Sequence, residues 1–234
     1  MDGRKLILEA RKQGRSALDE LAGKQLLASY GIAVPKSLVV RDAAQAASTC
    51  ATLKPPLVLK VMSPDILHKS DVGGVRVGLN SGEAIVEAIR EMMATPQIGN
   101  ARIDGFLVEE MAPAGQEIVI GGVRDPQFGP LVMLGLGGLF VEVLADVAFR
   151  ICPITGLDAE EMLDELKGAA LLAGARGRKP ASRAAVLDSL LKLGGAGGLL
   201  MSYADDIKEA DINPLIVSET GAMAVDARFV LTKR

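Results

Sequence analysis

One histidine occurs in the whole chain, and it lies in a polar, glycine-containing segment, Pro64–Val75. His68 is followed directly by Lys69 and, a few residues later, by the pair Gly73 and Gly74. Neutral imidazole is a good nucleophile toward phosphorus, lysine adds positive charge, and glycine lets the backbone approach an anion closely. A lone histidine is more often a surface or hydrogen-bonded residue than a catalyst. The segment therefore predicts phosphate chemistry only if the rest of the chain supplies the remaining groups.

A lysine interrupts an apolar run that is typical of a buried strand, Leu57–Val61. Burying Lys60 without a partner would cost on the order of a few kcal/mol or more. Two interpretations follow from this position. Lys60 forms an internal ion pair, or it binds a phosphate group.

Three glutamates follow in the β-rich middle of the chain. Glu109 and Glu110 stand at the end of a predicted strand, and Glu117 lies beyond a turn that contains Pro113. Carboxylates and nearby backbone groups in this arrangement can bind the amino group and the ribose hydroxyls of a nucleotide. A solvated turn would show a similar pattern.

The last third of the chain places oxygen ligands near the ends of apolar strands, at Asp211, Asn213 and Asp226. A small number of hard oxygen donors suits Mg²⁺, which keeps several waters and bridges to phosphate oxygens. The alternative interpretation is an ordinary turn signal before Pro214. A glycine run, Gly135–Glu142, is followed by Asp146 and Arg150, and it lacks the lysine of a P-loop.

These residues need a mixed helix and sheet framework, because strand-like and helix-like patterns alternate along the chain. Helices broken at Gly14 and Gly23 are predicted in 4–29, and a turn at 219–221 is predicted to join the last two strands. The predicted strands are 37–40, 57–61, 75–79, 105–111, 116–121, 130–134, 211–217 and 223–228, and further helices are predicted at 42–53, from Ser81 through Met92, at 158–166 and at 183–193.

Composition limits the class of protein. The 234 residues are 49% hydrophobic, enough for one large core or two small lobes, and the net charge of -3 has no basic block that would indicate a nucleic-acid partner. Cys50 and Cys152 cannot build a disulfide framework, and the longest apolar run, 131–141, is shorter than the roughly 18 residues of a membrane span. With no signal-like start, the expected location is the cytoplasm.

Several blocks together resemble the ATP-grasp domain of ADP-forming acyl-CoA synthetases, and more distantly the β subunit of succinyl-CoA synthetase. The resemblance covers nearly the whole chain and is carried by 57–60, 68–75, 128–150, 211–214 and 226–228. It implies an α/β (α+β) fold of two lobes that clasp ATP, here a single domain of residues 1–234 with lobes at about 1–104 and 105–234. It also implies a reversible ligase reaction, acyl-CoA with ADP and phosphate to acid, CoA and ATP, through a phosphorylated histidine.

The resemblance also implies roles for residues. Lys60 would contact the ATP phosphates, and His68 would relay the phosphoryl group with Asp71 orienting its imidazole. The remaining members of the implied ATP/ADP and Mg²⁺ sites are Gly73 and Gly74 in the phosphate-covering loop, Glu109, Glu110, Met111 and Glu117 around adenine and ribose, and Asn213, Asp226 and Asp211 at Mg²⁺.

A complete enzyme of this family also needs a CoA-binding part with a second histidine. This chain has no dinucleotide fingerprint and no other histidine, so the expected partner is a CoA-binding α subunit in a hetero-oligomer. Two alternatives stay open: a catalytically silent ATP-grasp module that regulates a partnered enzyme such as a protein acetyltransferase, and a carboxylate–amine ligase. The silent module tends to lack the histidine, and the carboxylate–amine ligase leaves His68 unexplained.

Overall fold

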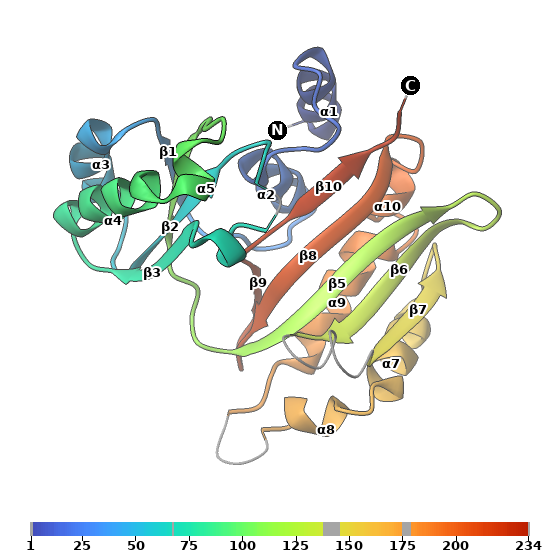
Figure 1. Cartoon of the computed structure of the whole chain (residues 1–234). Coiled ribbons are helices and arrows are strands. Elements are labelled where there is room, and N and C mark those ends of the chain that lie inside the picture. The colour runs from blue at the N-terminus through green and yellow to red at the C-terminus, as the bar shows by residue number, and fades with distance from the viewer. Residues whose placement is uncertain (1, 67, 138–145, 175–178, 234) are drawn as a thin grey trace. The chain divides into compact units, whose positions relative to one another are not determined.

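A computed structural model of the chain describes residues 2–66, 68–137, 146–174 and 179–233 (Figure 1). It divides into two compact units. The small unit is Pro35–Met111, and the large unit combines 1–34 with 112–234. This division differs from the predicted lobes 1–104 and 105–234, because the first two helices join the core of the large unit and the strand at 105–110 pairs inside the small one.

The small unit is built on a four-stranded antiparallel sheet with the order β1-β4-β2-β3. Its strands are β1 (Ser37–Val40), β2 (Leu57–Met62), β3 (Val75–Leu79) and β4 (Gly105–Glu110). Its helices are α3 (Ala43–Thr49), α4 (Gly82–Ala94) and α5 (Pro96–Gly99), with short 3-10 helices η1 (Cys50–Thr52) and η2 (Ser70–Val72).

Alternation along β2 decides which side chains enter the core of the small unit. Leu57, Leu59 and Val61 are buried in the same apolar cluster as Ile85 and Ile89 of α4. Ser81 caps helix α4, as predicted, because its side chain accepts from the N–H of Ala84 and satisfies one free donor. Successive residues of a strand point to opposite faces, so Lys60 faces away from this cluster.

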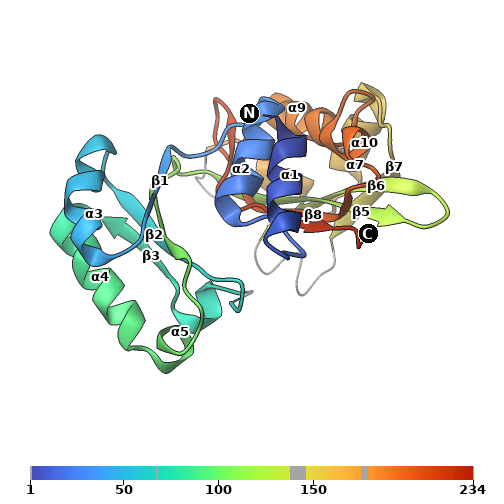
Figure 2. The ribbon, with the colours of Figure 1, turned by 90° about the horizontal axis from the view of Figure 1, so that it is seen from above.

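The large unit is built on a six-stranded antiparallel sheet with the path β10-β8-β5-β6-β7, to which β9 is added by pairing with β8. Figure 2 shows α1, α2, α9 and α10 gathered on one side of this sheet. Its strands are β5 (Gln116–Asp125), β6 (Gly129–Leu136), β7 (Val147–Ile151), β8 (Ile207–Val217), β9 (Ala222–Ala224) and β10 (Arg228–Leu231). Its helices are α1 (Gly3–Lys12), α2 (Glu20–Ser29), α7 (Gly156–Glu165), α8 (Ala169–Leu172), α9 (Arg183–Gly194) and α10 (Leu199–Ser202).

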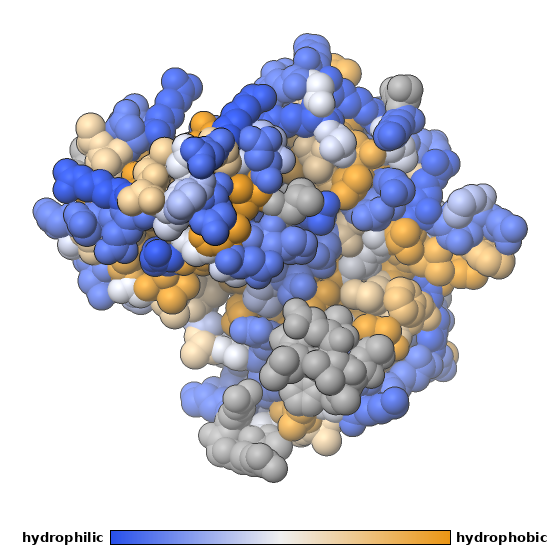
Figure 3. Space-filling view, viewed as in Figure 1, coloured by the Kyte–Doolittle hydropathy of each residue, from blue (hydrophilic) through white to orange (hydrophobic). Residues whose placement is uncertain are grey.

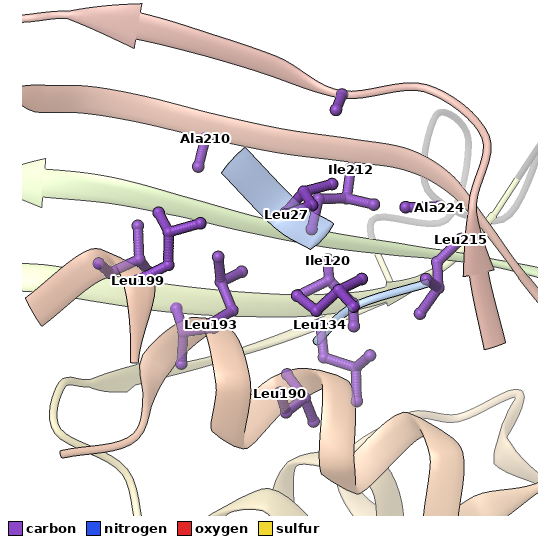
Figure 4. Packing of buried hydrophobic residues seen from close by; sticks show 14 of the residues in the cluster. Leu27, Ile120, Leu134, Leu190, Leu193, Leu199, Ala210, Ile212, Leu215 and Ala224 are labelled. Atoms are coloured by element: carbon purple, nitrogen blue, oxygen red, sulfur yellow. The ribbon is translucent and has the colours of Figure 1, made fainter. Parts of the chain in front are cut away.

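The core of the large unit lies between the sheet and these helices (Figure 4). Leu190 and Leu193 of α9 and Leu27 of α2 share one buried cluster with Ile120 and Leu134 of the central strands, and all five are fully buried. Burying a leucine side chain of this size stabilises the fold by about 1.5–3 kcal/mol. The helices therefore cover this face of the sheet and leave the opposite face uncovered by them.

The other face of β5, β6 and β7 exposes apolar side chains near the turn between β5 and β6 (Figure 3). Val123, Phe128, Phe149 and Ile151 are each between 41% and 60% exposed.

None of the helices within the described residues is long and apolar enough to span a membrane.

Two local predictions were wrong. Gly23 does not break a helix but lies inside α2, where a side chain would come within 3.0 Å of the Ala227 carbonyl oxygen. The predicted strand 223–228 is two strands, β9 and β10, with residues 225–227 between them. The predicted strands at 105–111 and 116–121 are present as β4 and β5, and the connection between them joins two different sheets.

Candidate functional site

Lys60 and Glu109 form a buried ion pair on one face of the small sheet. Lys60 pairs in register with Leu107 of β4, which places Glu109, two residues further along β4, on the same face as the lysine. Lys60 Nζ lies 3.0 Å from Glu109 Oε2, and the two side chains are only 8% and 2% exposed. The lysine therefore has the carboxylate partner that its burial requires, while its contact with phosphate stays a prediction.

The segment with His68 leaves the end of β2 and returns to β3. His68 itself is exposed, and Asp71 lies in the exposed turn η2. Within the described part of the chain, no hydrogen bond or ion pair joins His68 to Asp71. The orienting role of Asp71 thus stays a prediction, and an exposed imidazole has the access that transfer to and from other molecules demands.

The glycine pair has a structural reason at each position. Gly73 ends η2 with a φ of 72°, in the left-handed region that glycine adopts without strain. A side chain on Gly74 would come within 2.6 Å of Val61 Cγ1, so only glycine fits against β2 there. Gly73 therefore allows the turn to close, and Gly74 allows it to lie close to the strand that carries Lys60.

Glu110 and Met111 mark the end of β4. Glu110 Oε1 accepts from the backbone N–H of Lys54 at 3.0 Å, and the N–H of Met111 donates to the Pro56 carbonyl oxygen at 2.9 Å. These bonds fix the loop before β2 to the end of β4. The Met111 side chain is 47% exposed, so this end of the strand presents an apolar surface beside polar backbone.

Glu117 lies in the large unit, although Glu109 lies in the small unit. Its side chain is exposed on β5, and its carbonyl oxygen accepts from the N–H of Gly137 at 2.8 Å. The structure therefore does not place Glu109 and Glu117 on one hairpin. Of the glycine run 135–142, residues 138–142 lie outside the described residues.

The predicted metal ligands gather at one end of the β8–β10 pairing. Asp211 pairs with Arg228, and the N–H of Val225 donates to the Pro214 carbonyl oxygen at 3.1 Å. These two contacts bracket Asn213 and Asp226, which therefore lie next to each other. Asp211 and Asn213 are two residues apart in β8, and both are exposed.

The oxygen donors of Asp211, Asn213 and Asp226 suit Mg²⁺, which keeps water ligands, better than a metal ion whose ligands all come from the protein. Among the described residues, no group of three or more His, Cys, Asp or Glu side chains could hold a metal ion. One or two carboxylates with an amide oxygen leave room for water and substrate phosphate, which is how Mg²⁺ is usually bound. Asp226 Oδ1 also accepts from the N–H of Ala227 at 2.8 Å, which orients its carboxylate.

Two residues that follow the glycine run received no role from the sequence and turn out to fix β7. Asp146 is buried and accepts from the N–H groups of Lys167 at 2.8 Å and Gly168 at 2.9 Å. Arg150 pairs with Glu165 of α7, and this guanidinium holds the pKa of the Glu165 carboxyl below its usual range. An aspartate directly before an apolar strand was the signal available in the sequence.

Comparison with known proteins identifies the family of this chain. The family model described as "ATP-grasp domain" matches residues 9–231. The chain is 44% identical over 227 residues to the acetate–CoA ligase (ADP-forming) I subunit beta of Pyrococcus furiosus, covering 96% of each chain. It also matches the acetate–CoA ligase (ADP-forming) I of Archaeoglobus fulgidus with 44% identity over 89% of this chain, but only 30% of that longer protein. A more distant match is the succinate–CoA ligase (ADP-forming) subunit beta of Chlorobaculum parvum, with 26% identity over 91% of this chain and 56% of that protein.

Solved structures agree with the sequence relatives. The acetyl-coenzyme A synthetase 1 of Ca. Korarchaeum cryptofilum, in complex with coenzyme A, Ca-AMPCP and HgCl+, has a TM-score of 0.93 and 42% identity, covering 99% of this chain and all of that one. A second structure of that enzyme holds coenzyme A, acetyl-coenzyme A and a phosphorylated phosphohistidine segment. Its TM-score is 0.88 at 40% identity, over 99% of this chain and 100% of that one.

Proposed function

Because the chain belongs to the ATP-grasp family and is a relative of the β subunits of ADP-forming acetate–CoA ligases, we propose that it is the nucleotide-binding subunit of an ADP-forming acid–CoA ligase. The single observation that carries the proposal is the exposed histidine on a glycine-closed turn beside the strand of a buried lysine. A nucleophile, an anion-binding loop and a fixed cation are the groups that phosphoryl transfer requires.

The proposed step is transfer of the γ-phosphoryl group of ATP to His68. The lone pair of a neutral imidazole nitrogen attacks phosphorus, the bond from phosphorus to the bridging oxygen breaks, and ADP leaves with that electron pair. Lys60 lowers the energy of the charge on the phosphate oxygens, and the backbone at Gly73 and Gly74 lies against them. In the proposed roles, Asp71 orients the imidazole.

The remaining proposed contacts divide between the two units. In the small unit Glu109, Glu110 and Met111 lie along the end of β4 and would bind adenine and ribose. In the large unit Glu117 would bind ribose. Asn213 and Asp226, with Asp211, would hold Mg²⁺. When bound, Mg²⁺ would neutralise part of the phosphate charge.

A partner completes the reaction in this proposal. Phosphate on His68 must be passed to a second acceptor before acid and CoA are joined, and the chain contains no other histidine. The beta-subunit names of the relatives and the longer fused relative both support a CoA-binding α subunit. We place the complex in the cytoplasm, where ATP and the thiol of CoA are both available.

The test is labelling of the full chain with Mg²⁺ and γ-labelled ATP. We expect an acid-labile, base-stable phosphate on the unchanged chain and none on His68→Ala, while Arg90→Ala, an exposed position on α4, serves as control. An acid-stable label that survives His68→Ala would sink the proposal. Purification of the tagged chain with a CoA-binding protein tests the partner separately.

A further inference from the structure

The histidine segment is fixed at both of its ends by side chains that have no role in the mechanism above. We propose that Asp65 and Arg76 are positioning residues, which hold the two ends of the segment and thereby place His68 for phosphoryl transfer. This inference rests on the proposed function, because it names what positions the same nucleophile. All of the contacts concerned lie within the small unit.

The first anchor is Asp65, three residues before His68. Its Oδ2 accepts from the backbone N–H of Arg102 at 2.8 Å, and its own N–H donates to Ser63 Oγ at 3.1 Å. The neighbouring bond from the N–H of Asp104 to the Met62 carbonyl oxygen, 2.8 Å long, continues the attachment of this corner to β2. The segment therefore starts from a corner tied to the chain that precedes β4.

The second anchor lies behind the histidine. The N–H of Gly74 donates to the Lys69 carbonyl oxygen at 2.7 Å, which closes Lys69–Gly74 into one turn, and the N–H of Val61 donates to the Gly74 carbonyl oxygen at 2.9 Å. The turn is thus joined to β2 at its last residue. His68 is the residue immediately before it.

Arg76 fixes this turn from β3. One guanidinium nitrogen of Arg76 donates to the Gly73 carbonyl oxygen at 2.7 Å and to the Val75 carbonyl oxygen at 3.3 Å, and Nε lies 3.9 Å from Glu91 of α4. Gly73 is the left-handed residue of the turn, so its carbonyl direction decides where the turn points. Arg76 holds that direction with a charged donor, which makes a stronger hydrogen bond than a neutral one.

Chain length explains why the anchors matter for His68. Three residues span at most about 10–11 Å, so Asp65 sets the greatest distance at which His68 can lie from the fixed start of the segment. On the other side the closed turn adjoins it directly. An exposed side chain has little packing to orient it, and an error of about 1 Å in the position of a reacting group can cost up to about 100-fold in rate.

The experiment measures single-turnover labelling of His68 by Mg²⁺ and γ-labelled ATP in the full chain, with nucleotide affinity from calorimetry and stability from urea unfolding. The test variants are Asp65→Ala and Arg76→Ala. Their matched controls are Asp42→Ala, whose carboxylate also accepts a backbone N–H, from Gln45 at 2.9 Å, and Arg90→Ala, whose side chain and whose partner Glu87 are both exposed on α4.

We expect both test variants to label at least about tenfold more slowly, with unchanged affinity for the nucleotide, while both controls label at the normal rate. Asp65→Asn keeps an oxygen acceptor for the Arg102 N–H and should restore most of the rate. Arg76→Lys keeps one charged donor and should restore part of it. These rescues separate positioning from a general loss of structure.

Three outcomes would overturn the inference. Labelling of Asp65→Ala and Arg76→Ala at the normal rate removes their positioning role. A rate loss that follows a matching loss of stability or of nucleotide affinity makes them ordinary structural residues. Absence of label from the unchanged chain refutes the proposed function itself, and the inference with it, so the two failures are told apart by the unchanged chain.

Discussion

The ion pair between Lys60 and Glu109 allows a test that separates a structural lysine from a phosphate-binding one. Removing one partner of a buried pair leaves an uncompensated charge and costs about 3–5 kcal/mol, whereas replacing both by apolar groups is often neutral. With side chains 8% and 2% exposed and 3.0 Å apart, this pair falls in that class. We therefore expect Lys60→Met to lower the free energy of unfolding of the small unit by about 3–5 kcal/mol.

The double variant Lys60→Met with Glu109→Leu should return to within about 1 kcal/mol of the unchanged chain. Since removal of either partner is expected to cost about 3–5 kcal/mol and removal of both at most about 1 kcal/mol, the cycle should give a coupling energy of at least about 5 kcal/mol. Urea unfolding followed by far-ultraviolet circular dichroism measures all four chains of the cycle. Calorimetry then compares nucleotide affinity between the double variant and the unchanged chain. Both are expected to be stably folded, so a difference in affinity is not caused by unfolding.

Because Glu109 is also proposed to contact adenine and ribose, the part due to phosphate is the loss of MgATP affinity beyond the loss of adenosine affinity. Loss of a charged donor to phosphate costs about 1.5–3 kcal/mol, so this part should be about 10- to 150-fold. The pair Lys24 and Glu20 of α2 provides a matched control, since it is also buried and 2.9 Å long. Lys24→Met with Glu20→Leu should leave MgATP affinity unchanged. If the Lys60 and Glu109 double variant is stable and binds MgATP normally, the lysine is structural only and our assignment to phosphate is refuted.

Three further results are expected. Asn213→Ala and Asp226→Ala should each weaken binding of the Mg²⁺-nucleotide in calorimetry with little change in urea unfolding; unchanged affinity removes them from the metal site. Asp146→Ala should lower the free energy of unfolding by about 2–4 kcal/mol, because two buried N–H groups lose their acceptor, and a loss below about 1 kcal/mol would contradict this. Burial raises the pKa of the Cys152 thiol from 9.0 to about 11. The folded chain therefore holds this proton more tightly, and its contribution to stability, on the order of 2 kcal/mol, is present below pH 9 and lost as the pH rises toward 11; Cys152→Ser should flatten that decline.

The partner of Lys60 shows where sequence reasoning stops. The apolar run around the lysine predicts that it needs a compensating charge, which the structure confirms. Which carboxylate supplies it depends on the register between β2 and β4, and a shift by one residue would turn Glu109 to the opposite face. Register between strands far apart in sequence depends on the whole core, and no local pattern encodes it.

The glutamates show a second limit. Glu109 and Glu117 are close in sequence, and a turn with Pro113 between two strand patterns is typical of a hairpin. In the structure β4 pairs with β1 and β2, while β5 pairs with β6 and β8. The short connection crosses from one sheet to the other, and only the long-range pairing partners reveal this.

Helix ends were predictable for a local reason. Ser81 caps the helix that follows by accepting a backbone N–H three residues on, as the serine and the apolar spacing after it predict, and Ser182 caps α9 in the same way in the structure. Asp65 and Arg76 could not be assigned in this way. Their partners are backbone groups of a distant loop and of a left-handed glycine, and neither leaves a pattern in the sequence.

Lys60 and His68 are held in position in different ways. Labelling rate and stability should therefore change independently of each other, which can be measured. Lys60 is positioned by burial, so variants of its pair change stability and nucleotide affinity together unless both partners are replaced. His68 is exposed, so its position comes from bonds at the ends of its segment, which contribute little to the core. Across the variants at Lys60, Glu109, Asp65 and Arg76, we expect the labelling rate at saturating nucleotide to show no correlation with the free energy of unfolding. A single line through all of them would mean that His68 is placed by the stability of the small unit as a whole.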